Sequence, residues 1–102
     1  MYNVVLITTP SIKEAKCIAK VLLEKKLVAC INIIEKVESL FWWKGKIEKA
    51  KEALLIIKSK KKNFSSLLKE VKKIHSYTVP EIISLEIKEG NKSYLDWINE
   101  SC

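Results

Sequence analysis

The sequence predicts an α+β fold, and three of its features carry that prediction. An extended apolar segment near the N-terminus is followed by apolar residues at helical spacing. Two further extended segments, joined by a glycine-containing turn, are followed by a second helical pattern and a last extended segment. Apolar residues make up 48% of the 102 residues, which is enough for one hydrophobic core, and the length is too short for two. We therefore expect one domain over residues 1–102.

The first strand and the first helix follow directly from local patterns. Tyr2–Thr8 is an almost continuous apolar run, which predicts a strand buried on both faces. Pro10 comes next and is followed by Ser11-Ile12-Lys13-Glu14, which has the Ser-x-x-Glu form of a capping box. Apolar residues at helical spacing continue behind this cap, so a helix is predicted over residues 12–25.

A long β-hairpin is predicted between residues 27 and 57. Its first strand is rich in Val and Ile and continues through aromatic residues to a turn at Lys44-Gly45-Lys46. Gly45 is the residue of this turn that enters positive φ without strain. The returning strand is polar from Ile47 to Glu52 and apolar from Ala53 to Ile57. We therefore expect the half nearest the turn to protrude from the domain.

The remaining elements complete a known arrangement. Asn63 is expected to cap a second helix, whose apolar stripe runs from Phe64 to Ile74. Pro80 separates this helix from a strand at residues 82–87, and Gly90-Asn91 precedes a short terminal helix. The order is βαββαβ plus a C-terminal helix. Two βα units joined by a hairpin form an antiparallel sheet with both helices on one face, which predicts a ferredoxin-like sandwich with a long protruding hairpin.

The formal net charge of +7 suggests an anionic partner, but the type of basic residue argues against nucleic acid. All 19 basic residues are lysine, and they are interleaved with eleven glutamates. Arginine, whose planar fork reads guanine edges and clamps phosphates, is absent from the sequence. A solvated surface explains this pattern better, so no nucleic-acid partner is expected.

Apolar runs and cysteines indicate the compartment. The longest uninterrupted apolar runs, such as Ala53–Ile57, are about five residues long, whereas a membrane span needs about 20. The N-terminus lacks the basic region and cleavage site of a signal peptide. Cys17, Cys30 and Cys102 are irregularly spaced and odd in number, which fits a reducing compartment with free thiols. We therefore expect a cytoplasmic protein with no membrane partner.

Motifs for catalysis are missing. The two glycines form no phosphate-binding loop or dinucleotide fingerprint. One histidine cannot form a His-rich zinc site, and no nucleophile elbow accompanies His75 and Asp96. Paired carboxylates such as Glu48 and Glu52 lie among lysines and are expected to be solvated. The protein is therefore expected not to be an enzyme.

Phe41-Trp42-Trp43 is the least ordinary segment of the chain. On an extended strand, Trp42 points to one face and Phe41 and Trp43 to the other. One aromatic ring buries roughly 150–250 Å², which at about 25 cal/mol/Å² gives an upper bound near 4–6 kcal/mol. We favour an oligomer interface at these three residues. The alternatives are an internal aromatic cluster under a bent hairpin, and a stacking platform for a ligand or nucleobase, which the absence of arginine weakens.

His75 admits two interpretations. A lone histidine at the end of a helix often serves as a helix-end cap. His75, Tyr77 and Glu81 also surround the rigid turn at Pro80, so their polar groups could converge on a pocket. Cys30 could offer a soft ligand to a metal, although one His and one Cys make an incomplete site.

Five ordered blocks resemble the CutA family of divalent-cation tolerance proteins and extend over essentially the whole chain. The blocks are LVACINI (27–33), FWWKGKIE (41–48), LIIK (55–58), HSYTVPEII (75–83) and GNKSYLDWI (90–98), preceded by Thr8-Thr9-Pro10 at the first turn. The resemblance implies a ferredoxin-like subunit in a homotrimer with hairpins that pair between subunits. It also implies a role in tolerance to copper and other divalent cations, without an established enzymatic activity. The pocket residues that it implies, near subunit boundaries, are Cys30, Trp43, Lys58, His75, Tyr77 and Glu81.

This chain departs from the family pattern at several positions. Ser76 and Thr78 replace a proline and a glutamate that the family commonly carries. Copper-binding members have a cysteine and a second histidine where this chain has Ile7 and Ile74, so His75 is the one metal ligand that remains. Copper or another divalent cation is therefore a doubtful cofactor. The alternative function is a trimeric small-molecule-sensing or signalling protein with a polar pocket between subunits.

Overall fold

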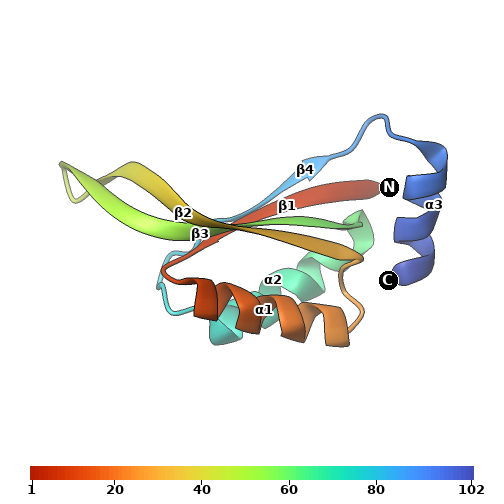
Figure 1. Cartoon of the computed structure of the whole chain (residues 1–102), viewed down its shortest axis with the longest axis horizontal. Helices are drawn as coiled ribbons and strands as arrows, with labels where there is room; N and C mark the ends of the chain where they lie inside the picture. Colours follow the sequence, from red (N-terminus) through yellow and green to blue (C-terminus); the bar gives the residue numbers. More distant parts are fainter.

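The computed structural model describes residues 1–102 and has the predicted order of elements. They are β1 (Tyr2–Thr9), α1 (Ile12–Glu24), β2 (Cys30–Trp43), β3 (Lys46–Lys60), a 3₁₀ turn (Lys61–Asn63), α2 (Phe64–Ile74), β4 (Ile82–Glu86) and α3 (Lys92–Ser101). The sheet has the order β2-β3-β1-β4, and all neighbouring strands are antiparallel. Helices α1 and α2 cover one face, and α3 packs at the end opposite the hairpin (Figure 1). The ferredoxin-like fold and its protruding hairpin are confirmed.

The hydrophobic core lies between the sheet and the two helices. The predicted stripe of α1 is buried at Ala15, Ile18, Ala19 and Leu22, and α2 contributes Leu67 and Val71. They pack on fully buried residues of β1 and β3: Val5, Ile7, Leu55 and Ile57. None of the three helices has the length and apolar character needed to cross a bilayer.

The prediction that the first strand is buried on both faces is wrong for the single subunit. Along β1, buried residues alternate strictly with half-buried ones. The physical reason is that α1 and α2 lie on the same face, and α3 covers only one end of the other, where Lys60 donates to Asn99. We call this second surface the open sheet face and define it by Val4, Leu6, Leu54, Ile56, Ile83 and Leu85, which the strand register places together.

Two of the side chains predicted to cap helices make other hydrogen bonds than expected. Ser11 Oγ accepts a hydrogen bond from the Glu14 N–H at 3.1 Å, as expected for an N-cap. The Glu14 carboxylate, however, accepts from the Ser76 N–H at 3.0 Å, so it ties α1 to the loop after α2. Asn63 makes no side-chain cap and instead donates from Nδ2 to the Leu27 carbonyl at 3.3 Å. For Glu14 and for Asn63, a hydrogen bond to a distant part of the chain thus replaces the predicted bond within the helix cap.

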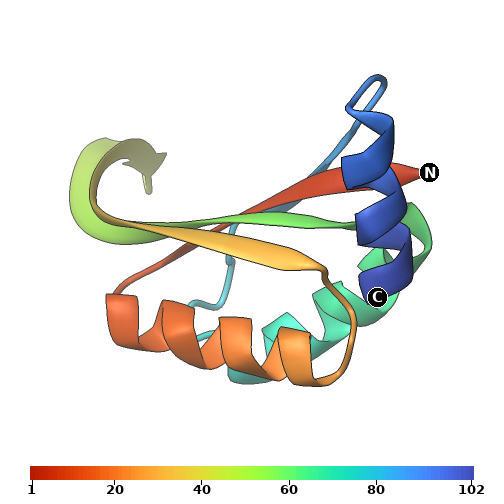
Figure 2. The same ribbon diagram turned by 45° about the vertical axis from the view of Figure 1, so that its right-hand side comes forward.

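The hairpin bends strongly along its length. Its register runs from Cys30 opposite Lys58 to Trp43 opposite Lys46, with a bulge between Ile34 and Val37. A bulge increases strand twist, and Figure 2 shows the hairpin curling out of the plane of the sheet. The turn uses positive φ at two residues, Lys44 (51°) and Gly45 (80°), and not at the glycine alone. Positive φ at both central residues gives the turn a backbone twist that matches the right-handed twist of the two strands.

Candidate functional site

An open pocket of about 920 Å³ lies where the hairpin leaves the domain. Its walls come from β2, β3, the end of β1 and the loop between α2 and β4. Of the residues predicted to form a pocket, it brings together Trp43, Tyr77 and Glu81. Phe41, predicted as an interface residue, also lines it. Glu52 lines it too and was expected to be solvated.

Glu52 is the pocket residue that the sequence interpretation misjudged. It is half-buried, and its Oε2 accepts a hydrogen bond from the Tyr77 hydroxyl at 2.8 Å. The signal was present in the strand period, because Glu48 and Glu52 alternate with lysines along β3 and therefore share one face. Their neighbours in sequence are lysines, but their neighbours in space line the pocket.

The carboxylates perturb the titration of this site. Burial, the hydrogen bond to Glu52 and the charge of Glu52 raise the pKa of Tyr77 to about 12, so its hydroxyl stays protonated at neutral pH. Partial burial and the charge of Glu52 also raise the pKa of Glu81 above its ordinary value. Both carboxyl groups line the same pocket.

His75 lies directly behind the pocket, with its side chain fully buried. Its Nε2 is 2.8 Å from the Thr8 carbonyl oxygen, and its Nδ1 accepts the Tyr77 N–H at 3.1 Å. This pair of contacts requires the neutral tautomer with the proton on Nε2. Glu14 Oε2 lies 3.4 Å from Nδ1 but has no proton there to accept in this tautomer. We therefore assign this contact to proximity and not to an ion pair.

The predicted helix-end position of His75 is correct, with a different bonding pattern. His75 is the C-cap residue of α2, and its backbone N–H donates to the Val71 carbonyl at 2.8 Å. Its side chain bonds to β1 and to the following loop, and makes no bond to a helix carbonyl. His75 thus fixes the loop that carries Tyr77 against the end of β1.

The residues of the single chain do not fit a copper or other divalent-cation site. Both ring nitrogens of His75 are already engaged in hydrogen bonds. Ile7 is fully buried in the core, and Ile74 ends α2 without a ligand atom. No three side chains of His, Cys, Asp or Glu stand together as a ligand set. A metal would have to break the existing hydrogen bonds of His75 and recruit further ligands.

Cys30 and Lys58 lie away from the other predicted pocket residues. They face each other across β2 and β3, and the Lys58 ammonium donates to Asn32 Oδ1. Along β1, Lys58 pairs with Val4, whereas the pocket begins at Thr8, a separation of four residues or roughly 13 Å. Burial and the neighbouring Cys30 thiol raise the pKa of Tyr94, which places α3 beside this second group.

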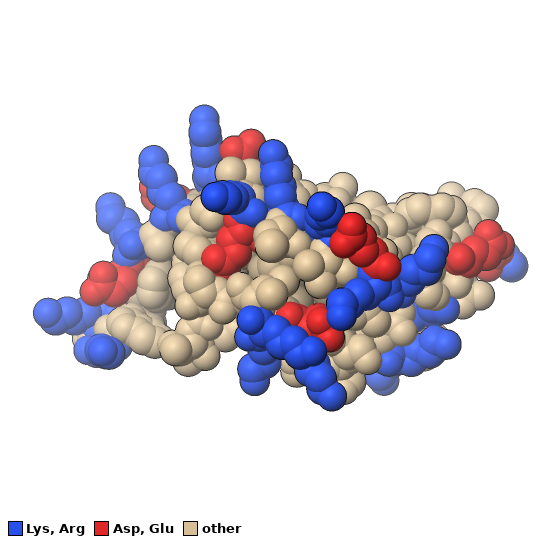
Figure 3. All heavy atoms as spheres, turned by 90° about the horizontal axis from the view of Figure 1, so that it is seen from below, with Lys and Arg blue, Asp and Glu red and all other residues tan.

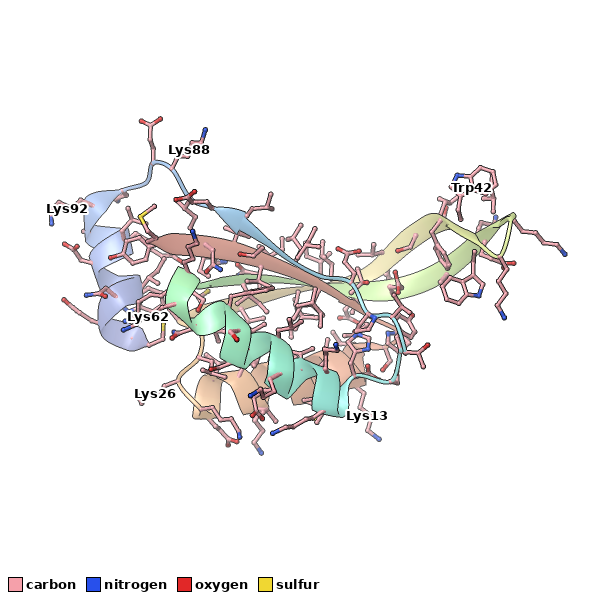
Figure 4. The ribbon with its side chains drawn as sticks, turned by 180° about the vertical axis from the view of Figure 1, so that it is seen from behind. Lys13, Lys26, Trp42, Lys62, Lys88 and Lys92 are labelled. Atoms are coloured by element: carbon pink, nitrogen blue, oxygen red, sulfur yellow. The ribbon has the colours of Figure 1, made fainter.

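The hairpin aromatics divide between two faces as the strand period predicts. Trp42 is 73% exposed and pairs with Ile47, which is 62% exposed. Figure 4 shows Trp42 at the far end of the hairpin, on the side away from the helices. Phe41 and Trp43 lie on the other face and line the pocket. The alternative of an internal aromatic cluster is therefore wrong for Trp42.

Together, the ferredoxin-like sheet, the curled hairpin and the pocket at its base define a class of small α+β proteins with a protruding hairpin. The family model described as "CutA1 divalent ion tolerance protein" matches residues 3–101. The chain therefore belongs to the CutA1 family, and the predicted resemblance is confirmed.

Relatives agree with this assignment in sequence and in structure. The chain is 50% identical to the divalent-cation tolerance protein CutA of Archaeoglobus fulgidus over 99% of its length and 98% of the relative's. It is 46% identical to the CutA of Thermus thermophilus, over the same shares of each chain. The solved structures from these organisms match with TM-scores of 0.95 and 0.96, again over 99% of this chain and 98% of each solved chain. CutA1 from Oryza sativa matches with a TM-score of 0.95 at 42% identity, over 98% of this chain and 92% of the solved one.

Proposed function

We propose that this CutA-family protein is a cytoplasmic homotrimer that acts in tolerance to divalent cations, copper included, by binding and assembly. No catalytic step is part of this proposal. The name of its relatives supports the role in divalent-cation tolerance. The observation that carries the proposal is the pair of uncovered apolar surfaces on one subunit, namely the open sheet face and the end of the hairpin.

The open sheet face supports assembly because its composition is that of an interior. Ile83 and Leu85 on β4 are 48% and 52% exposed, and they continue the half-buried aliphatic residues of β1 and β3. Soluble monomers rarely expose a contiguous apolar surface of this kind. Its burial against a second subunit would remove it from water at about 25 cal/mol/Å².

The hairpin supports a ring and not a twofold dimer. Its exposed face, with Leu40, Trp42 and Ile47, is a different surface from the open sheet face. If the hairpin of one copy contacts the open sheet face of the next, the contact is heterologous, and such contacts form a ring when the rotation between copies closes. The number three comes from the family resemblance.

Light scattering of the purified protein tests the assembly. A mass of three times the 11.8 kDa subunit is expected at micromolar concentration. Trp42→Ala should shift the equilibrium toward smaller species, because large rings at interface centres commonly contribute 2 kcal/mol or more. Leu23→Ala is a suitable control, since it truncates a part-exposed apolar side chain on α1, away from both uncovered apolar surfaces. A monomer at all concentrations would overturn the trimer.

The cytoplasmic part of the proposal rests on the three free cysteines, which fit a reducing compartment. One solved relative is described as the "Periplasmic divalent cation tolerance protein CutA" from Archaeoglobus fulgidus, so the compartment needs a direct test. Fractionation of cells should place the protein with cytoplasmic markers. Recovery outside the inner membrane would contradict this.

A second candidate is a trimer that senses a small molecule through the pocket. The observation in its favour is a large pocket near His75 that lacks a metal ligand set. Calorimetry of the assembled protein with Cu(II) and Zn(II) separates the two functions. Metal affinity that falls on Cys30→Ser or His75→Gln supports the first, since these residues would then ligate across subunits. Metabolite binding without metal affinity supports the second.

A further inference from the structure

The formal net charge of the protein is concentrated on one side of the sheet. We call residues 11–26, which contain α1, and residues 61–74, which contain the 3₁₀ turn and α2, the helix layer. Ten lysines and three glutamates lie in this layer, which gives it a net charge of +7. The other nine lysines are balanced by the other nine carboxylates, so the rest of the chain is neutral. Figure 3 views the molecule from the helix side and shows lysine side chains projecting from it.

Most lysines of the helix layer have no counter-charge. All ten are exposed, and the carboxylate that pairs with any of them is that of Glu70, which lies 3.1 Å from Lys25 Nζ and 3.2 Å from Lys73 Nζ. A second carboxylate of the layer, that of Glu14, accepts the Ser76 N–H at 3.0 Å. The remaining eight lysines make no ion pair in the subunit. A surface with uncompensated charge of one sign attracts polyions of the other sign.

An open recess of about 560 Å³ extends this surface at the start of α2. Its lining consists of Lys60, Lys61, Lys62, Met1 and Asn99, and it includes no carboxylate. Lys60 Nζ donates to Asn99 Oδ1 at 3.3 Å, whereas Lys61 and Lys62 have exposed side chains. The recess thus offers two exposed ammonium groups to an anion.

The apolar residues of the helix layer argue against a lipid bilayer as the partner. Proteins that lie on bilayers combine lysines with apolar side chains that enter the membrane. The large apolar side chains exposed on the layer are Leu23, near the end of α1, and Ile74, at the end of α2. The start of α1 lies beside the end of α2, because Glu14 bonds to Ser76, so Leu23 and Ile74 lie at opposite ends of the layer. They form no common patch for insertion.

Nucleic acid is also a poor match, because its bases are recognised by arginine or by exposed aromatic rings. The layer has no arginine, and its single aromatic residue, Phe64, packs against the core. Lysine is a compact, strongly hydrated point charge, which suits a partner that offers charge and no further group to recognise. We propose that the helix layer binds inorganic polyphosphate, a flexible linear chain of phosphate groups without sugars or bases.

The helix layer stays accessible in the proposed assembly, because it lies on the opposite side of the sheet from the open sheet face (Figure 1). In a ring built on the open sheet faces, the helix layers of the copies point outward in different directions. A flexible chain can follow such a surface from one copy to the next, and contact with several copies raises the apparent affinity. The inference goes beyond the proposed function and does not depend on the trimer, since each layer carries its own charge.

Calorimetry on the purified protein tests the proposal with three probes: inorganic polyphosphate, a single-stranded oligonucleotide of matched charge, and vesicles that contain phosphatidylserine. Polyphosphate should bind most tightly. Its affinity should fall at least about tenfold between roughly 50 and 200 mM salt, because binding to a phosphate chain releases counterions. Tighter binding of the oligonucleotide or of the vesicles would identify a different partner and overturn the proposal, as would an absence of polyphosphate binding.

Matched charge reversals locate the site. Lys16→Glu on α1 and Lys62→Glu in the recess should each weaken polyphosphate binding by roughly 2- to 30-fold, since each removes one attraction and adds one repulsion. Lys88→Glu changes the net charge equally and should leave binding nearly unchanged. Figure 4 shows Lys88 in the loop before α3, on the side of the molecule away from α1 and α2. Equal weakening by Lys88→Glu would show attraction by net charge alone and overturn the assignment to the helix layer.

Light scattering on the same variants separates this inference from the proposed assembly. The three reversals lie outside the open sheet face and the hairpin, so the mass in solution should be unchanged. A trimer that binds no polyphosphate overturns the inference and leaves the assembly standing. A monomer that binds polyphosphate through Lys16 and Lys62 overturns the trimer and leaves the inference standing.

Discussion

The two faces of the sheet are built from the same kinds of residue and have different surroundings. On the helix-covered face, Ile57 and its neighbours are fully buried by α1 and α2. On the open sheet face, Ile56 and its neighbours are equally apolar and remain half-exposed. The covered face explains why the subunit folds. The open sheet face has no such layer over it in the subunit, and its apolar character is the reason that we propose a second subunit there.

Adjacent residues of β3 provide the strongest test of this comparison. Ile57→Ala removes a fully buried side chain, and such truncations cost about 2–5 kcal/mol because they leave a cavity. Ile56→Ala should have a cost that depends on protein concentration, since its side chain would be buried through assembly. Urea unfolding at several protein concentrations measures both free energies. A concentration-independent cost of similar size in both variants would contradict the assignment of the two faces.

The same strands show why sequence predicts the fold better than it predicts the faces. The order of elements and the helical stripes follow from local periodicity, and the structure has them all. The continuous apolar run at residues 2–8 correctly predicts a strand with two apolar faces. It cannot tell whether the second face is covered by a helix of the same chain or by another subunit, because both require the same residues.

The candidate site was predictable in part for a related reason. His75, Tyr77 and Glu81 lie close in sequence around Pro80, so their convergence follows from local geometry. Cys30 and Lys58 were grouped with them by family resemblance, and in one subunit they are roughly 13 Å away along the strand. The partnership of Glu52 with Tyr77 depends on a loop that crosses the sheet, which no local pattern encodes.

His75 provides a test of intermediate size, because it belongs to the covered side and not to the assembly surface. His75→Ala would leave the Thr8 carbonyl and the Tyr77 N–H without their partners. A buried group left unsatisfied costs about 1–3 kcal/mol, so the free energy of unfolding should fall by that order. His75→Gln can restore part of the loss, since its amide both donates and accepts. Light scattering should show an unchanged mass, and loss of the trimer in His75→Ala would contradict a purely structural role.

The smallest expected effect concerns the contact that joins the hairpin to the loop. Tyr77 has a pKa of about 12, above its ordinary value of 10.0. The pKa of Tyr77 is therefore higher in the folded protein than in the unfolded chain. Its contribution to the free energy of unfolding is complete below pH 10 and is lost as the pH rises through 12. Tyrosinate absorbance followed against pH measures this titration, and Tyr77→Phe assigns it.

Glu52→Gln separates the causes of that shift. It removes the negative charge beside Tyr77 and keeps an amide acceptor, so the pKa of Tyr77 should fall part of the way toward 10.0. The fall is partial because burial, the largest cause, remains. Glu48→Gln, on the same face of β3 and lining the same pocket, is the control and should leave the pKa of Tyr77 near 12. An unchanged pKa in Glu52→Gln would mean that burial alone raises the pKa of Tyr77 and that the contact between the hairpin and the loop contributes nothing to it.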